Sequence, residues 1–225
     1  CTPGMIRELV FGFLFTEGWI DEADDVGEAE ILETRGANGE ALIEARVRVS
    51  TLKADPAGPG MARISFSSCG ICGKEGYSGL KKGLVRIKGR RRYSMGFLKS
   101  LSGKMEEVQR LYKKTGGSHA AVLFDPEGTP VLYGEDMGRH NALDKVIGAS
   151  LLRGVPREEN VLVSSGRASL EMVFKTVRAG VPVFIAMSRP TSRAVDAAKA
   201  YNLTLIDMAK GANRIYSHAR RIKGF

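Results

Sequence analysis

The second half of the chain alternates short apolar runs with longer amphipathic segments, and this alternation restricts the fold more than any other feature. Runs with the length and composition of buried strands occupy residues 120–124, 131–133, 161–164, 183–187 and 203–208. Apolar residues at helical spacing fill most of the gaps, at residues 143–151, 170–177 and 192–201. Because strand–helix–strand units make right-handed crossovers, we expect an α/β layered domain with mainly parallel pairing.

Further local signals complete this half. Asp125-Pro126-Glu127-Gly128 carries Pro and Gly at positions that a type I turn accepts, so it predicts a turn between the first two strands. Residues 215–216 are expected to add an edge strand. Apolar residues at helical spacing from Leu98 to Tyr112 predict one helix that ends at Gly116-Gly117.

The first half of the chain has fewer predicted helices and strands than the second. Thr2-Pro3 is typical of a helix start, with a capping hydroxyl and a proline at the first position, and the helix is expected to end at Gly18. Strict alternation from Ile43 to Val49 predicts a half-buried strand. The chain begins with Cys1 and opens almost directly into this helix, so we expect an N-terminal segment to be missing.

A glycine-containing basic segment separates the halves. It runs from Lys81 to Arg92 as KKGLVRIKGRRR, and we place a domain boundary within residues 93–96. The expected architecture is therefore a smaller N-terminal α+β domain at residues 1–95 and an α/β layered domain at residues 96–225.

Charge and cysteine content limit the partners and the compartment. The 225 residues carry a net charge of +9, which favours an anionic partner such as phosphate, nucleic acid or an acidic protein. No run of 18 apolar residues is present, so no membrane span is expected. Three cysteines do not make a disulfide framework, and a reducing cytoplasm is the expected compartment.

Three loops that follow predicted strands carry arginine. They are residues 138–141, 164–167 and 188–191, with Arg139, Arg167 and Arg189. Ligands collect where strands of an open α/β sheet end, and free N–H groups beside a guanidinium suit phosphate. The alternative is ordinary helix capping with each arginine in solvent. His140 lies in the first loop and is a better site candidate than His119 or His218.

A CxxC stands in the stretch SFSSCGICGKEGYSG at residues 65–79, with Cys69 and Cys72. Zinc is disfavoured because no second CxxC follows and no H-x-E accompanies a P-C-x-x-C. A redox disulfide wants its first cysteine at a helix N-terminus, which this glycine-rich stretch does not predict. A sulfur-carrying loop wants a mobile backbone and nearby lysines, and both are present. Spacing alone leaves redox chemistry and sulfur transfer close to even.

The chain resembles the FdhD family of formate dehydrogenase accessory sulfurtransferases. The motifs that carry the resemblance are TPGMIRELVFGFLFTEGWI, FSSCGICGK, GGSHAAVLFD, EDMGRHNALDKVIG, SSGRASLEMVFKTVRAGVPVFIA and LTLIDMAKGANRIYSH. Several long motifs in the family's order make the match specific. Family members usually carry a segment before the TPG stretch, in agreement with the expected missing N-terminus.

The resemblance implies a sulfur carrier and assigns its residues. Cys69 matches the cysteine that accepts sulfur from a cysteine desulfurase as a persulfide, and Cys72 matches its CxxC partner. The sulfur passes to the molybdenum cofactor, a bis(molybdopterin guanine dinucleotide), which serves formate dehydrogenase. The family's guanine-dinucleotide segment falls on Met208, Ala209, Lys210, Gly211, Ala212 and Asn213. In this segment the chain departs from the family's F-x-[RK]-G-G-R pattern, and the segment is about one residue shorter than in the family.

The resemblance also implies a cytidine-deaminase-like C-terminal domain without zinc ligands, and a cytoplasmic homodimer. No nucleic-acid partner, membrane or protein-held metal is expected. Two alternatives stay open: a zinc-dependent deaminase-like enzyme, and a basic nucleic-acid-binding module that uses residues 81–92. The second has few aromatic residues for base stacking beside the basic run.

Overall fold

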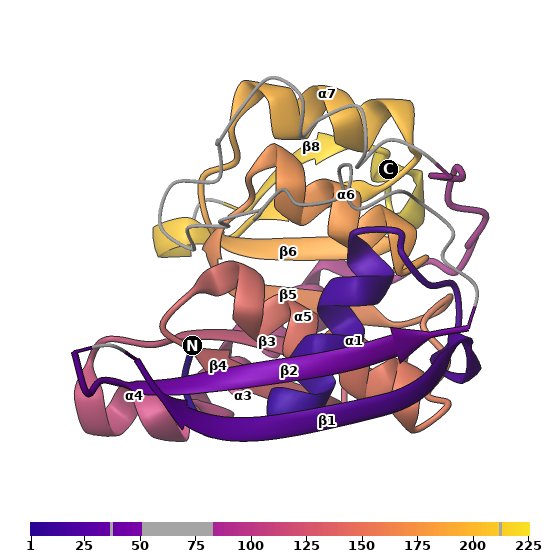
Figure 1. Cartoon of the computed structure of the whole chain (residues 1–225). Coiled ribbons are helices and arrows are strands. Elements are labelled where there is room, and N and C mark those ends of the chain that lie inside the picture. The colour runs from indigo at the N-terminus through magenta and orange to yellow at the C-terminus, as the bar shows by residue number, and fades with distance from the viewer. Residues whose placement is uncertain (37, 51–82, 212) are drawn as a thin grey trace.

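The structure is a computed structural model that describes residues 1–36, 38–50, 83–211 and 213–225. Its N-terminal part contains a helix and a two-stranded antiparallel ribbon: α1 (Ile6–Thr16), the 3-10 helix η1 (Ala23–Asp25), β1 (Val26–Arg35) and β2 (Ala41–Val49). The ribbon lies over α1 (Figure 1), and the half-buried Val47 and Val49 face the main core. The strand predicted at residues 43–49 is confirmed.

The remaining elements build a six-stranded sheet with helices on both faces. They are α3 (Met95–Val108), α4 (Arg110–Thr115), β3 (His119–Phe124), β4 (Pro130–Asp136), α5 (Arg139–Leu152), β5 (Val161–Arg167), α6 (Leu170–Arg178), β6 (Val183–Ser188), α7 (Ser192–Ala200), β7 (Thr204–Asp207), η2 (Ala209–Gly211), β8 (Arg214–Ser217) and η3 (Ala219–Arg221). Every strand that the sequence predicted within these residues is present.

The strands are ordered β4-β3-β5-β6-β7-β8, and only β5–β6 and β6–β7 pair in parallel. The prediction of mainly parallel pairing is therefore wrong. β3 and β4 form a hairpin through the predicted turn, where the Gly128 N–H donates to Asp125 O at 3.0 Å. α5 then carries the chain from β4 across β3, so β5 runs parallel to β4 and antiparallel to the strand between them. β7 and β8 also pair antiparallel, because a short loop without a crossover helix joins them.

Alternate residues of the sheet enter two apolar clusters. Leu123, Leu162 and Phe184 face the cluster beneath α1, α5, α6 and α7, while Val122 and Val163 face the cluster beneath α3. Figure 1 shows α5, α6 and α7 stacked along one face of the sheet. α1 belongs to the same cluster as α5, although the sequence places it in the N-terminal half. The division of the chain between residues 95 and 96 stays a prediction.

The contact between α1 and α5 depends on two glycines. A Cβ atom on Gly12 would lie 1.9 Å from Asp144 O, and one on Gly148 would lie 1.9 Å from Glu8 O. The two helix backbones therefore approach at a distance that no side chain permits. This close approach is what brings the end of α1 to α5 and α6.

Two predicted helix boundaries are wrong for long-range reasons. α1 begins after Met5, and Thr2 instead donates its N–H and its hydroxyl to Asp136 Oδ2, at 2.8 and 3.1 Å. The helix predicted from Leu98 to Tyr112 divides at Gln109 into α3 and α4. The carboxylate of Glu135 on β4 accepts the N–H groups of residues 111 and 112, which gives α4 a start of its own. Within the described ranges, no helix combines the length and apolar character needed to cross a bilayer.

Candidate functional site

Four strands end at one edge of the six-stranded sheet, which we call the carboxyl edge. Two other strands begin there, so six strand termini meet: Asp136, Arg167, Ser188, Asp207, His119 and Arg214. The register places them in pairs, with His119 opposite Asp136, Arg167 opposite Ser188, and Asp207 opposite Arg214. The three arginine-bearing loops that the sequence singled out all start from this edge.

A bulge in β5 shapes the middle of the edge. The pairing of β5 with β6 shifts between Ser164 and Arg167, which takes Ser165 and Gly166 out of the ladder. Ser165 Oγ turns toward β3, accepts the Ala120 N–H at 2.9 Å and lies 3.3 Å from His119 Nδ1. A Cβ on Gly166 would come within 3.0 Å of the Arg139 side chain. Glycine at this position therefore lets the start of α5 lie against β5.

The arginines of the edge differ in exposure. Arg139 is buried, at 9% exposed, whereas Arg167 and Arg189 are exposed where they follow β5 and β6. Burial and the positive charge of Arg139 lower the pKa of His119, so this histidine is neutral at pH 7. The exposed Arg167 and Arg189 present the charge that an approaching anion meets first.

The carboxylate of Asp136 is fully hydrogen-bonded, so it serves as a structural contact and not as a free base. Its carboxylate accepts Lys145 Nζ at 2.7 Å, the Thr2 N–H at 2.8 Å, and the Gly138 N–H and Asn141 Nδ2 at 3.0 Å each. Burial raises the pKa of Asp136, but the Lys145 ammonium and the two backbone N–H groups outweigh burial and lower it overall. The residue holds the start of α5 in place.

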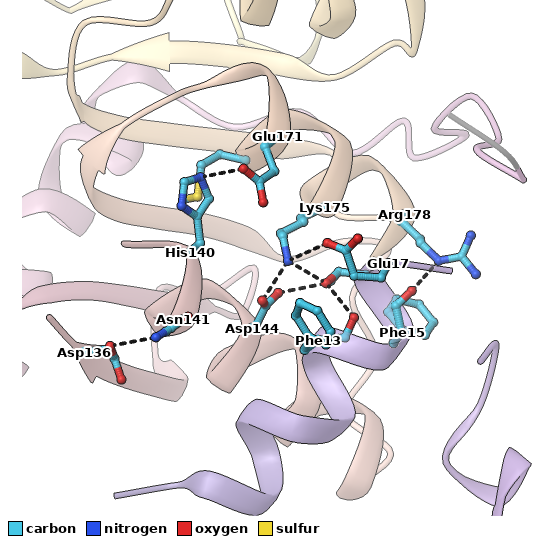
Figure 2. Close-up of polar contacts among 12 residues, drawn as sticks. Phe13, Phe15, Glu17, Asp136, His140, Asn141, Asp144, Glu171, Lys175 and Arg178 are labelled. Carbon is cyan, nitrogen blue, oxygen red and sulfur yellow. Dashed lines mark hydrogen bonds and ion pairs between the residues drawn. The ribbon is translucent and has the colours of Figure 1, made fainter. Parts of the chain in front are cut away.

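His140 is held beside a buried carboxyl group. Its Nε2 lies 3.3 Å from Glu171 Oε2 on α6 (Figure 2). It also lies 3.3 Å from the Oγ of Ser169, the N-cap residue of α6. Burial raises the pKa of Glu171. The pair couples α5 to α6 directly behind the carboxyl edge.

Sequence reasoning missed a buried ionic cluster below that pair. Lys175 Nζ donates to Asp144 Oδ2 at 2.7 Å and to Thr16 Oγ1 at 2.9 Å, and lies 3.5 Å from Glu17 Oε1 (Figure 2). Burial lowers the pKa of Lys175, but the charges of Asp144, Glu17 and Glu171 outweigh burial and raise it. The one signal in the sequence is a lysine inside the apolar stripe of α6. The cluster joins α1, α5 and α6 and supports the site from beneath.

The segment after β7 makes a compact loop at the same edge. Asp207 Oδ1 accepts the Ala209 N–H at 2.7 Å, which starts η2. Met208 is buried, with its N–H bonded to Ala186 O at 3.0 Å and its sulfur accepting from Ser102 Oγ at 3.2 Å. Met208 therefore anchors the start of the segment, and Gly211 farther along it is exposed.

The end of this loop uses left-handed backbone. Gly211 has φ 78° and Asn213 has φ 47°, and Asn213 Nδ2 donates to Gly211 O at 2.8 Å. Asp207 is completely buried, and its Oδ2 has no hydrogen-bond partner among the described residues. A buried acceptor beneath a tight, glycine-containing loop fits a ligand that donates N–H groups, as a guanine base does.

Several predicted site residues lie outside this geometry. Cys69 and Cys72 fall in residues 51–82, which lie outside the described residues. Ala212 and the side chain of Lys210 also lie outside the described part of the chain. The remaining cysteine, Cys1, is exposed. Within the described part of the chain, no three His, Cys, Asp or Glu residues form a group that could hold a metal ion.

Comparisons with known proteins agree with one another. A model of the FdhD/NarQ family matches residues 1–223. The sulfur carrier protein FdhD of Thermoplasma volcanium is 37% identical over 223 residues, which cover 98% of this chain and 79% of that protein. The protein of the same name from Sulfurisphaera tokodaii is 40% identical over 223 residues, covering 98% of this chain and 82% of the relative.

A solved structure has the same fold. It is described as a formate dehydrogenase accessory protein from Desulfotalea psychrophila, and it superposes with a TM-score of 0.72 at 23% identity. The superposition covers 98% of this chain and 80% of that one. The mixed α/β arrangement described above is therefore shared along nearly the whole chain.

Proposed function

Because the chain belongs to the FdhD/NarQ family, we propose that it is a sulfur carrier that serves formate dehydrogenase. Relatives at 37% and 40% identity bear the name sulfur carrier protein, and this chain has a CxxC at Cys69 and Cys72. The sulfur donor is a cysteine desulfurase, and the acceptor is the molybdenum cofactor with its two guanine dinucleotides.

The loading step is an exchange between two sulfur atoms. The Cys69 thiolate attacks the terminal sulfur of the desulfurase persulfide, the sulfur–sulfur bond breaks, and the desulfurase cysteine leaves as a thiolate. Cys69 then carries one additional sulfur atom as a persulfide. If the Cys72 thiolate next attacks the inner sulfur of that persulfide, a disulfide forms and the outer sulfur leaves as hydrosulfide.

The carboxyl edge is where we propose that the cofactor is held while sulfur is delivered. The observation that supports this assignment is that Arg139, Arg167, Arg189 and residues 208–211 all lie at this one edge of the sheet. Guanidinium groups and a tight loop after a strand suit the phosphates of a guanine dinucleotide. The orphan acceptor Asp207 Oδ2 suits the N–H groups of its base.

The proposal includes the assembly and the compartment. We expect a homodimer that acts in the cytoplasm, where reducing conditions keep Cys69 and Cys72 available as thiols. Light scattering on the purified protein measures the oligomeric state, and a mass equal to one chain contradicts the dimer.

Intact-protein mass spectrometry tests the loading step. The protein is incubated with a cysteine desulfurase and free cysteine. Conversion of a thiol to a persulfide adds one sulfur atom, or about 32 Da. Cys69→Ser is expected to lose the adduct, while Cys1→Ser, which removes an exposed thiol outside the motif, keeps it. An adduct that persists in Cys69→Ser and disappears in Cys1→Ser would show that Cys1 carries the sulfur, and it would contradict the assignment to Cys69.

A further inference from the structure

A basic hollow lies at the edge of the sheet opposite to the carboxyl edge. It measures ≈ 760 Å³, and its lining includes Arg86, Lys88, Arg90, Asn202, Arg220 and Arg221. Asn202 stands just before β7 begins, and Arg221 belongs to η3 after β8 ends. The hollow is therefore separated from the loop at residues 208–213 by the length of β7.

The described part of the hollow's lining carries charge of one sign. Among these described residues, five are cationic and none is acidic. Arg86, Lys88 and Arg90 are exposed at every second position of the segment before α3, and within the described residues none of them pairs with a carboxylate. Their neighbour Arg91, in contrast, pairs with Glu127 and Glu159 at 3.1 and 3.0 Å. The basic run thus divides into structural arginines and cations that face the hollow.

Arg221 is buried in the wall of the hollow with an open donor. It is 1% exposed, its Nε donates to Gly89 O at 2.8 Å, and its Nη1 donates to Thr204 Oγ1 at 3.1 Å. Its Nη2 has no hydrogen-bond partner among the described residues. Burial and the nearby charge of Arg220 lower the pKa of Arg221 to about 10. A buried guanidinium without a carboxylate is costly unless an anion binds it.

The backbone around the hollow is held in position. Asn202, in left-handed conformation at φ 63°, donates its Nδ2 to Ile87 O at 2.5 Å and accepts Arg220 Nη2 at 2.6 Å. A Cβ on Gly89 would lie 2.7 Å from Glu158 O, so glycine allows the segment to sit against the chain before β5. One side chain therefore ties two walls of the hollow together, which a solvated basic face does not need.

We propose that this hollow binds the phosphate groups of a small di- or triphosphate ligand. Its volume lies in the usual range of about 300 to 1,000 Å³ for small-molecule sites. Arginine forks match phosphate oxygens, and five cations suit a ligand with several negative charges. An acidic protein surface or a duplex is too broad to reach the buried Arg221, and the lining residues that the structure describes include no aromatic side chain to stack a nucleic-acid base.

Calorimetric titration of the full chain with inorganic pyrophosphate tests the proposal. The site variant is Arg86→Ser/Lys88→Ser, which changes exposed side chains that have no partner among the described residues. The matched control is Lys99→Ser/Lys114→Ser, which removes the same two charges from exposed positions of α3 and α4. We expect saturable binding that weakens about tenfold or more in the site variant and less than about twofold in the control.

Four results would overturn the proposal. The first is no saturable binding of pyrophosphate by the wild-type chain, and the second is equal weakening in the site and control variants. The third is weakening in Arg167→Ser/Arg189→Ser with none in the site variant, which would place the pyrophosphate at the carboxyl edge. The fourth comes from a parallel titration with a single-stranded oligonucleotide. If the oligonucleotide binds in the hollow and pyrophosphate does not displace it, the ligand of the hollow is a nucleic acid and not a small phosphate compound. Sulfur loading on Cys69 does not enter this test, so the two proposals fail separately.

Discussion

Two buried cations in this protein have opposite surroundings. Lys175 and Arg221 are each 1% exposed. Lys175 lies 2.7 Å from Asp144 and 3.5 Å from Glu17, and its pKa is raised, whereas no carboxylate pairs with Arg221 in the described residues and its pKa is lowered to about 10. A cation buried with its counterions joins helices, and a cation buried without them is placed for an anion from outside. Burial alone does not separate structure from function here, but the partners do.

The largest expected effect comes from removing the paired cation. Lys175→Met leaves Asp144 buried beside Thr16 without its ammonium, and loss of one member of a buried pair costs about 3 to 5 kcal/mol. Urea unfolding measures this loss against Lys99→Met, which changes an exposed lysine of α3.

The matching double variant sharpens the same point. Lys175→Met/Asp144→Leu removes both charges, so we expect it to recover much of the stability that Lys175→Met loses. A loss below about 1 kcal/mol in Lys175→Met, the size of an exposed pair, would mean that the cluster is not structural.

A second variant separates the helices that carry the cluster. Gly148→Ala puts a Cβ 1.9 Å from Glu8 O, so α1 must shift away from α5, and we expect a loss of about 3 kcal/mol or more. Gly103→Ala on α3 meets nothing within 4 Å and is expected to gain up to about 1 kcal/mol from helix propensity. Similar unfolding free energies for the two variants would contradict the described contact between α1 and α5.

If the hollow around Arg221 binds phosphate groups, pyrophosphate should stabilise the folded protein against unfolding. At about a hundredfold excess over Kd, pyrophosphate should raise the unfolding free energy of the wild-type chain by about 2.7 kcal/mol. At the same concentration, tenfold weaker binding should leave Arg86→Ser/Lys88→Ser with about 1.4 kcal/mol of this stabilisation, and weaker binding with less. Thermal unfolding with and without pyrophosphate measures both, and equal stabilisation of the two proteins would remove the hollow from the explanation.

The smallest effect concerns pH. The folded-state pKa of Asp136 is lowered, so its stabilising contribution is complete above the unfolded value of about 3.9 and is lost as pH falls through the folded value. The difference in unfolding free energy between wild type and Asp136→Asn should therefore shrink on acidification below about pH 4. A difference that stays constant across that window would mean that Lys145 and the backbone N–H groups do not stabilise the carboxylate.

Local patterns predicted the elements well, since strand and helix signals in this chain are periodic and bounded by turns. They could not predict pairing directions, because β5 is placed antiparallel to β3 by the path of α5 over the hairpin. They also placed the first helix start at Thr2, whose hydroxyl is taken by Asp136 on a strand far along the chain.

The candidate site divides in the same way. The position of the arginine loops could be predicted because loops after strands of one direction share an edge, and Arg139, Arg167 and Arg189 do lie there. Their role in binding stays a prediction. Asp144, Lys175 and Arg221 were missed, because the charge of a side chain in a sequence says nothing of which carboxylate reaches it. The roles of Cys69 and Cys72 stay predictions from the motif and the family.

Sulfur delivery tests the central claim most directly. The chain is loaded with radioactive sulfur by a cysteine desulfurase and mixed with formate dehydrogenase that contains the molybdenum cofactor, and label on the cofactor is counted. We predict that Cys69→Ser neither loads nor delivers, and that Arg167→Ser/Arg189→Ser loads normally but delivers less than Lys99→Ser/Lys114→Ser, which carries the same charge. Full delivery by Arg167→Ser/Arg189→Ser would contradict the carboxyl edge as the place of transfer, and delivery by Cys69→Ser would contradict the carrier itself.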